Sequence, residues 1–272
     1  MEFSPDPAVV LTIAVAEYLY LRALRILRRR GVAVRASQKW LWHAGIALWA
    51  VGLLSPVDPL GDELLSAHMA QHLLIADLGA PLLLAGARHP VLMFLLPRAA
   101  LVTLARRRRL RAAFRFLRRP LVALAVYVAL LYAWHVGVLF EAAVEYSAVH
   151  ALQHASFVGA GILVWWAALD PKRRRMPGQL WKIPYLLGAR MAGMMLGMGF
   201  VLIRVPIYAG VYGEGERRGF SAVHDQQLAG GMMVTLDILI MAFALCFFFL
   251  RAAQDGARDD AGAAPRAALT RR

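Results

Sequence analysis

The sequence predicts an all-α integral membrane protein that folds as a bundle of seven transmembrane helices. Of its 272 residues, 60% are hydrophobic and 18% are charged, and the mean hydropathy is +0.55. Soluble domains have about 45–50% apolar and about 25% charged residues, so both fractions depart from a soluble composition in the same direction. A helix that crosses a bilayer needs about 20 apolar residues, and runs of this length recur along the whole chain.

Seven apolar runs define the expected spans. They cover residues 8–27, 40–57, 64–86, 120–139, 147–169, 183–205 and 227–250. The first run lies between the acidic residues Glu2 and Asp6 and a group of arginines over residues 22–30, which indicates a retained anchor rather than a cleaved signal peptide. Residues 251–272 are rich in Ala, Asp and Arg, and we expect them to form a disordered cytoplasmic tail.

The distribution of charge predicts the orientation of the bundle. The 31 Lys and Arg residues exceed the 17 Asp and Glu residues and give a formal net charge of +14. With the N-terminus outside and the C-terminus in the cytoplasm, 27 of the 31 fall on the cytoplasmic side, in residues 22–39, 88–119, 172–182 and the tail. Such a bias is typical of cytoplasmic loops, so the charge indicates topology and not a nucleic-acid partner. We expect residues 88–119 to form a short interfacial helix and a solvated basic loop that contacts anionic membrane lipid.

Two copies of one histidine motif lie near the outer ends of two predicted spans. His68 and His72 begin the third span, and His150 and His154 begin the fifth, each pair in the pattern H-x-x-Q-H. Residues four apart lie one turn apart on the same face of a helix, so each pair can bind one metal ion together. Both spans run from outside to inside, which places the two pairs at equal depth.

Two more histidines reach the same layer from other spans. His135 ends the fourth span and His224 precedes the seventh. A single histidine at a helix end is usually a hydrogen-bonded interfacial residue, but six on four helices predict a metal site, and imidazole suits Cu, Zn and Fe. The lone cysteine, Cys246, lies in an apolar run, which excludes an intramolecular disulfide and a cysteine-based metal site.

Polar neighbours of these histidines are candidate auxiliary residues. Gln71 and Gln153 each precede the second histidine of a pair, and Asp225 and Gln226 follow His224. On a helix the two glutamines are rotated by about 100° from the neighbouring histidine. They either orient an imidazole as hydrogen-bond partners or bind a neighbouring helix.

Methionines form a second candidate set of metal ligands. One stripe in the sixth span contains Met191, Met194, Met195 and Met198. Met198, Met232 and Met233 are expected near the histidine layer, as is Met69. A thioether selects Cu(I) among biological metals, but methionine is also a flexible packing residue, so both interpretations stay open.

Four ionisable residues fall inside predicted spans. They are Glu17, Asp77, Arg190 and Asp237. Ionisable groups within a membrane are usually paired or line a pathway. Asp77, Arg190 and Asp237 are therefore interpreted either as an ion pair that fixes helix register or as a relay for protons or metal.

The motifs together resemble the multi-spanning CtaG family of bacterial cytochrome c oxidase assembly factors over about residues 40–245. In chain order they are Ser55-Pro56, His68-x-x-Gln71-His72, Ala80-Pro81-Leu82-Leu83, His135, His150-x-x-Gln153-His154, Trp165-Trp166 and the run from Asp225 to Met232. The resemblance implies a seven-helix protein of the bacterial plasma membrane that helps to mature a heme-copper oxidase of the respiratory chain. It also implies copper handling for an outer-facing or membrane-embedded centre. The implied partners are oxidase subunits and a copper-donor protein.

The first functional hypothesis is therefore a non-enzymatic copper chaperone. Copper, as Cu(I), would bind the four paired histidines at the outer side, with His135 and His224 as additional or exchange ligands. The main alternative is a redox protein, either one with bis-histidine heme between the third and fifth spans or a metal-dependent membrane oxidoreductase. Two histidines one turn apart would crowd one side of a heme, which favours direct metal binding. A third hypothesis is a transporter of copper or protons that uses Asp77, Arg190 and Asp237.

Overall fold

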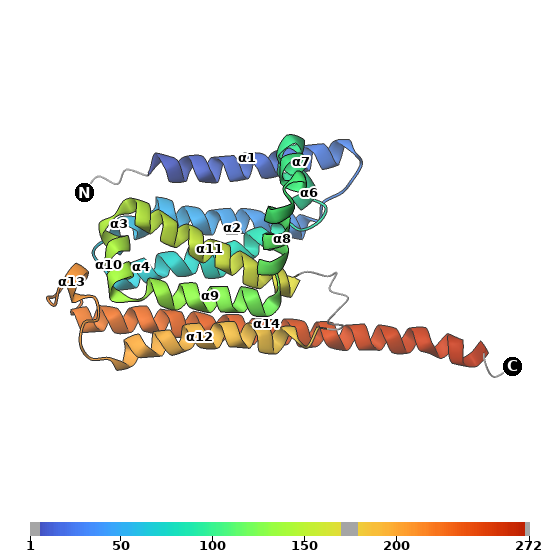
Figure 1. The fold of residues 1–272 in the computed structure, drawn as a ribbon. Helices are drawn as coiled ribbons and strands as arrows, with labels where there is room; N and C mark the ends of the chain where they lie inside the picture. Colours follow the sequence, from blue (N-terminus) through green and yellow to red (C-terminus); the bar gives the residue numbers. More distant parts are fainter. Residues whose placement is uncertain (1–5, 170–178, 270–272) are drawn as a thin grey trace.

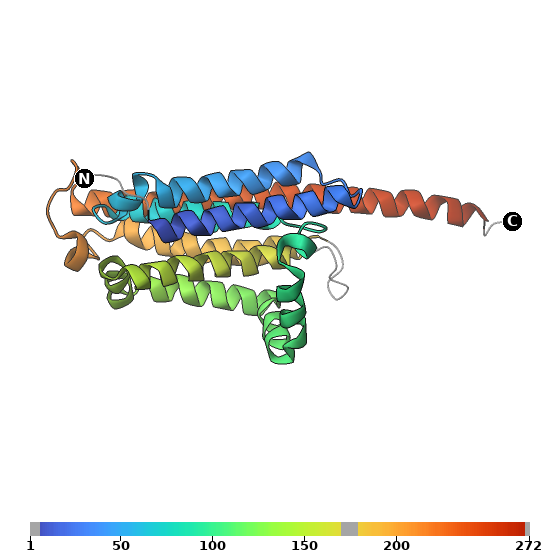
Figure 2. The ribbon, with the colours of Figure 1, turned by 90° about the horizontal axis from the view of Figure 1, so that it is seen from above.

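The computed structural model describes residues 6–169 and 179–269, with side chains up to residue 256. Long helices lie side by side with their axes nearly aligned (Figures 1 and 2). In chain order the elements are α1 (Pro7–Arg29), α2 (Ala36–Leu54), α3 (Val57–Gly61), α4 (Leu65–His72), the π-helical segment η1 (Leu73–Gly79), α5 (Ala80–Gly86), α6 (Leu92–Leu95), α7 (Arg98–Arg106), α8 (Arg108–Leu117), α9 (Pro120–Trp134), α10 (Gly137–Glu145), α11 (Ser147–Leu169), α12 (Lys182–Leu202), α13 (Ala209–Tyr212) and α14 (Ala222–Leu269).

Five helical segments among the described residues are long and apolar enough to cross a membrane. They are α1, the continuous segment Leu65–Gly86, α11, α12 and the part of α14 over Ala222–Gly256. A sixth is α8 with α9, if this pair, bent by 80°, forms one span. The structure thus confirms an all-α membrane protein, while the count of seven spans and the orientation stay predictions.

The other two expected spans are shorter or more polar than we expected. The 15 residues of α9 end at Trp134, because the chain turns at His135 and restarts as α10, so the expected span over residues 120–139 is interrupted. Helix α2 has 19 residues, but Gln38, Lys39 and His43 lower its hydropathy. Both helices still pack within the bundle, α2 against η1 and α5 and α9 against α11 and α12.

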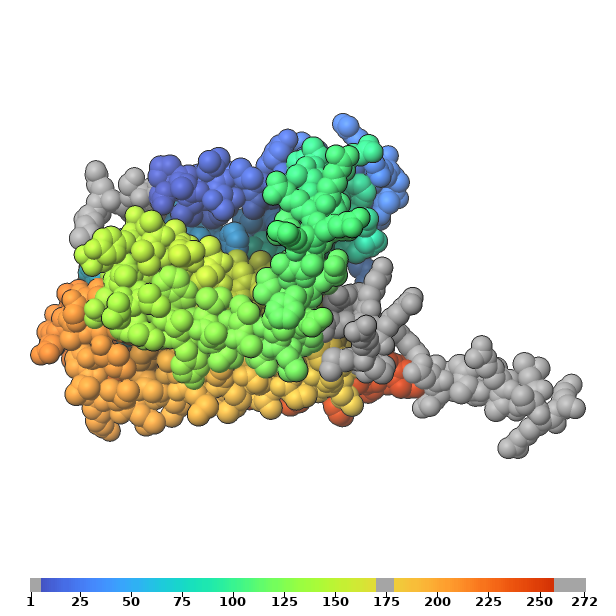
Figure 3. All heavy atoms as spheres, in the orientation of Figure 1, coloured from blue at the N-terminus to red at the C-terminus, as the bar shows by residue number. Residues whose placement is uncertain are grey.

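The arginine-rich connection between α5 and α9 is helical where we expected a solvated loop. Helices α7 and α8 cross one end of the bundle as a ridge (Figures 1 and 3). Exposed Leu110, Phe114 and Phe116 alternate with arginines on α8. An amphipathic helix of this composition suits the surface of an anionic membrane.

The last helix also extends further than expected. Helix α14 continues beyond residue 250 to Leu269, where we expected a disordered tail over residues 251–272. The segment is rich in Ala, the best helix former, which favours continuation of the helix. Glu2 and most of the expected cytoplasmic loop over residues 172–182 lie outside the described residues, as do residues 270–272.

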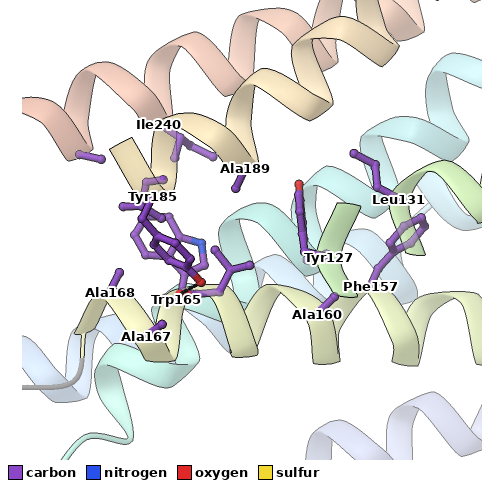
Figure 4. Packing of buried hydrophobic residues seen from close by; sticks show 14 of the residues in the cluster. Tyr127, Leu131, Phe157, Ala160, Trp165, Ala167, Ala168, Tyr185, Ala189 and Ile240 are labelled. Atoms are coloured by element: carbon purple, nitrogen blue, oxygen red, sulfur yellow. Dashed lines mark hydrogen bonds between the residues drawn. The ribbon is translucent and has the colours of Figure 1, made fainter. Parts of the chain in front are cut away.

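Two apolar clusters fill the bundle between α9, α11, α12 and α14. In the larger cluster, Tyr127 and Phe157 lie at one end and Trp165 and Tyr185 at the other (Figure 4). The smaller cluster surrounds Met69, Phe140 and Met233 near the starts of α4 and α14. Helix α1 lies at the edge, where Tyr20 stacks on Trp42 of α2 with ring centroids 4.3 Å apart. The edge position of α1 leaves the centre of the bundle to the histidine-bearing helices.

Glycines bring α12 and α14 into close contact. A Cβ atom added at Gly197 would lie 2.9 Å from the Gly230 carbonyl oxygen and 3.1 Å from the Met233 Cβ atom. Small residues allow membrane helices to pack with their backbones close together. On the same helix, a Cβ atom at Gly199 would meet nothing within 4 Å.

We predict that Gly197→Ala lowers the free energy of unfolding by about 1–3 kcal/mol, because the new methyl group must push two backbones apart. Gly199→Ala is the matched control and should leave stability unchanged or slightly raised. Thermal unfolding of both variants in detergent measures the difference. Equal melting temperatures for the two variants would contradict the close contact of α12 with α14.

Candidate metal centre

The structure brings the four paired histidines together between α4 and α11. The ring centroids of His68 and His72 lie 4.4 Å apart, those of His68 and His150 5.0 Å and those of His150 and His154 4.1 Å. The imidazole of His154 also packs edge-on against His72, at 5.0 Å. One nitrogen from each of His68, His72 and His150 lies within 4.8 Å of the others. A metal ion between them would therefore meet three imidazoles from two helices.

Most nitrogens of this cluster lack a hydrogen-bond partner. His68 is 0% exposed and His72 is 6% exposed, and no nitrogen of either ring makes a hydrogen bond of normal geometry within residues 6–169 and 179–256, although Gln153 and the Gly61 backbone lie close to the His68 ring. The Nε2 atoms of His150 and His154 are unpartnered in the same way. A buried polar group without a partner costs about 1–3 kcal/mol. A bound cation would satisfy these lone pairs, so the donor set fits a metal that accepts imidazole.

His135 lies beside the cluster, behind two phenylalanine rings. Its ring centroid is 6.4 Å from that of Phe140 and 6.2 Å from that of Phe157, and these rings also contact His68 and His72. The Nδ1 atom of His135 lies 2.7 Å from the Leu131 carbonyl oxygen. Because a carbonyl only accepts, Nδ1 must be the protonated nitrogen. The buried Nε2 atom therefore carries a free lone pair and is oriented as a metal-ligating histidine usually is.

The structure does not bring His224 to the other histidines. It is exposed at the start of α14 and packs against Phe220. The next residue, Asp225, points inward, and its carboxylate accepts hydrogen bonds from the backbone N–H groups of Leu65 (2.7 Å) and Ser66 (3.2 Å). Asp225 thus caps the N-terminus of α4 from a distant helix and helps to fix the first histidine pair.

The three candidate glutamines differ in their surroundings. The side chain of Gln71 donates to the Gly52 carbonyl (3.0 Å) and to Asp58, so it ties α4 to α2 and α3. Gln226 accepts from Ile207 N–H (2.8 Å) and donates to carbonyls at the end of α12. Gln153 is 0% exposed, and its amide nitrogen and oxygen are both unpartnered in the described chain. Of the three, Gln153 has hydrogen-bonding capacity to spare beside the imidazoles.

A π-helical segment begins directly after the first histidine pair. Residues of η1 widen the helix, and the Ile75 carbonyl accepts a hydrogen bond from Trp49 Nε1 at 3.0 Å. A π-helical turn inserts extra backbone into a helix, and such turns occur often at functional sites. The insertion changes the direction in which η1 and α5 face relative to His68 and His72. No local sequence pattern predicted this π-helical segment.

Two acidic residues that the sequence did not single out lie near His150. Asp58 and Asp62, on α3 and the loop before α4, are close enough to interact electrostatically with His150. Desolvation raises the pKa of the Asp62 carboxyl, and His150 opposes that effect. The adjacent Glu63 forms two hydrogen bonds with Arg218, at 2.7 and 2.9 Å, and this contact lowers the pKa of Glu63. The Asp62 carboxylate is exposed at this end of the bundle.

The methionine stripe of the sixth span faces away from the cluster. Met195 is 66% exposed and Met198 is 40% exposed, because the glycine face of α12 packs inward against α14. Met198 is therefore not placed to bind a metal at the histidines. Met232 is half-buried, whereas Met233 and Met69 are buried in the core below the cluster.

The three intramembrane charged residues lie together beneath the histidines. The Nη1 atom of Arg190 contacts a carboxylate oxygen of Asp77 and one of Asp237, the latter at 2.8 Å, and Nη2 donates to the Tyr127 hydroxyl at 2.6 Å. These residues come from α12, η1, α14 and α9, so the ion pair joins four elements. Glu17 lies elsewhere, between Trp42 and His43.

These features define a class of protein, an α-helical membrane protein with a buried polyhistidine cluster between two of its helices. The chain belongs to the family described as cytochrome c oxidase caa3 assembly factor (Caa3_CtaG), which matches residues 18–255. Two uncharacterized proteins, from Mycobacterium bovis and Mycobacterium tuberculosis, are each 27% identical over 243 residues, covering 83% of this chain and 36% of theirs. The chain thus spans about a third of the length of these curated relatives. No solved structure matches it.

We predict that Asp225→Ala lowers the free energy of unfolding by about 1–2 kcal/mol, because α4 loses its N-terminal cap. The neighbouring variant His224→Ala serves as the control, since His224 is exposed, and it should unfold like the parent protein. Denaturant unfolding in detergent, followed by circular dichroism, measures both. An Asp225→Ala variant as stable as His224→Ala would rule out the capping role.

Proposed function

We propose that this chain is a membrane assembly factor for a heme-copper cytochrome c oxidase and that it binds copper, as Cu(I), at His68, His72, His150 and His154. Membership of the caa3 assembly-factor family supports the assembly role. The observation that carries the copper proposal is the set of buried imidazole nitrogens without hydrogen-bond partners. Within a bilayer, polar groups without partners are costly and usually functional. In this proposal the protein binds and transfers copper and does not catalyse a reaction.

The chemistry of the donors favours Cu(I) over harder cations. The cluster offers neutral imidazoles, without a carboxylate among the four. Imidazole binds copper well, whereas oxygen ligands suit Mg²⁺ and Ca²⁺. A monovalent ion also adds less charge to a low-dielectric interior than a divalent ion does. The copper is a cargo in this proposal, bound and then passed to an oxidase subunit.

The packing of the rings argues against the heme alternative. A bis-histidine heme needs a slot for the macrocycle between its two axial ligands. Here His68 and His150 face each other at 5.0 Å with their planes inclined by 12°, and Phe140 and Phe157 pack against the cluster. The space between the helices is filled by these rings, which suits a single ion.

The placement of the elements supports an outward-facing site. The histidine pairs begin α4 and α11, at the end of the bundle where α3, α10 and α13 lie (Figure 1). The arginine-rich α7 and α8 lie across the opposite end. If the arginines mark the cytoplasmic side, the copper site faces the outside of the bacterial plasma membrane, where oxidase subunits and a copper-donor protein would meet it.

We predict that His72→Ala and His154→Ala abolish copper retention and oxidase maturation while the protein still inserts into the membrane. Each variant loses a ligand, so its affinity should fall by more than the roughly 10–100-fold that loss of an outer-shell partner costs. Anaerobic Cu(I) titration of the detergent-solubilised protein measures retention, and oxidase activity of the host membranes measures maturation.

The control for this experiment is His89→Ala. His89 is exposed and follows α5, at the far end of the segment that begins with the first histidine pair. This variant should bind copper like the parent protein. If the two single variants and the double variant all bind copper like the parent, the site is wrongly assigned. A Soret band in the absorption spectrum of the purified protein would favour heme instead.

A further inference from the structure

A small cavity lies directly below the histidine cluster, toward the centre of the bundle. Its volume is about 40 Å³, and its walls come from α4, η1, α9, α11 and α14. Met69, His72, His135 and Met233 line one part of it, and Asp77 and Tyr127 line another. The cavity therefore connects the histidines with the Arg190 ion pair. The cavity has room for at least one water molecule, and therefore also for a single small ion.

The lining contains an unused set of soft ligands. Met69 is 2% exposed and Met233 is 5% exposed, and they come from α4 and α14. His135 adds a third donor from the end of α9, because its Nδ1 atom is held by the Leu131 carbonyl and its buried Nε2 atom is unpartnered among the described residues. Two thioethers and one imidazole are a soft donor set that selects Cu(I) over Zn²⁺ and other harder ions.

The charge next to the cavity also favours a monovalent cation. Arg190 carries one positive charge, and it contacts the carboxylates of Asp77 and Asp237. Two carboxylates face one guanidinium, so this group carries at most one excess negative charge, and Asp77 lines the cavity directly. One positive charge in the cavity is the most that this excess can balance, whereas a divalent ion would leave unbalanced positive charge in the membrane.

His72 connects the two places. It belongs to the three histidines whose nitrogens lie within 4.8 Å of one another, and it also lines the cavity. A neutral imidazole has one lone pair, so His72 binds one ion at a time. The His72 imidazole can therefore release an ion at the histidine cluster and bind one in the cavity while the other ligands of both sites stay in place.

We propose that this cavity is a second Cu(I) site, with Met69, Met233 and His135 as ligands, and that His72 exchanges between it and the histidine cluster. The inference rests on the proposed copper function and adds a second position for the same cargo. The copper stays Cu(I) throughout, and the exchange replaces one ligand by another without electron transfer. In this proposal, copper that enters near the exposed Asp62 binds first at the histidine cluster and then moves into the cavity.

Two anaerobic measurements on the full chain in detergent test this proposal. Cu(I) titration against a chromophoric chelator gives the stoichiometry, and X-ray absorption identifies sulfur among the copper ligands. The parent protein should bind two Cu(I) ions and show copper–sulfur scattering. The double variant Met69→Leu/Met233→Leu should bind one ion and lose that scattering, because leucine has a similar volume but no sulfur.

The matched control is Met195→Leu/Met198→Leu, which changes two exposed methionines on α12. It should keep both ions and the copper–sulfur signal. A parent protein that binds one ion through nitrogen alone would overturn the second site and leave the proposed function intact, whereas a parent that binds no copper would overturn both. Loss of both ions from Met69→Leu/Met233→Leu would also contradict the proposal, since the thioethers would then belong to a single site.

Discussion

Inside a bilayer, an imidazole nitrogen without a protein partner finds no water to bind, and this constraint governs the end of the bundle that holds the four paired histidines. His68 and His72 are buried and His150 and His154 are half-buried, although most of their nitrogens lack hydrogen bonds within the described residues. The surrounding helices hold the rings in contact rather than separating them. An arrangement with this cost is stable only if other contacts fix it, and those contacts are found on the neighbouring elements.

The fixing contacts come from residues far away in the sequence. Asp225 of α14 caps α4, Gln71 ties α4 to α2, and Trp49 binds a carbonyl of η1. Two of these hydrogen bonds join the segment Leu65–Gly79 to α2, and the third joins it to α14. The glycines between α12 and α14 bring α14 close enough to the rest for Asp225 to reach its target. The position of the histidine pair thus depends on contacts with α2 and α14.

Beneath the histidines lies a second polar layer, in which Arg190 is paired with Asp77 and Asp237. The two terminal nitrogens of Arg190 bind Asp77, Asp237 and Tyr127, while its Nε atom has no partner among the described residues, and these contacts join α12 to η1, α14 and α9. Breaking one partner of such a buried pair is costly, which is one reason why register is well defined here. The small cavity lies between the two polar layers, where the packing of η1 and α9 is irregular. Met69, Met233 and Asp77 all line this cavity.

Local sequence patterns were enough to predict the membrane class, most helices and the meeting of the two H-x-x-Q-H pairs, because apolar length and four-residue spacing are properties of a single helix. They did not reveal that α9 stops at Trp134, that α4 passes into a π-helical turn, or that Met198 faces outward while Met69 and Met233 face the cavity. Those outcomes depend on which face of each helix meets its neighbours. His224 and Asp225 show the difference most clearly, since adjacent residues on one helix point in different directions. The sequence by itself determined which residue types lie at the same end of the bundle, and only the tertiary structure decided which of them share a site. That choice depends on the rotation of each helix relative to its neighbours, which no local spacing encodes.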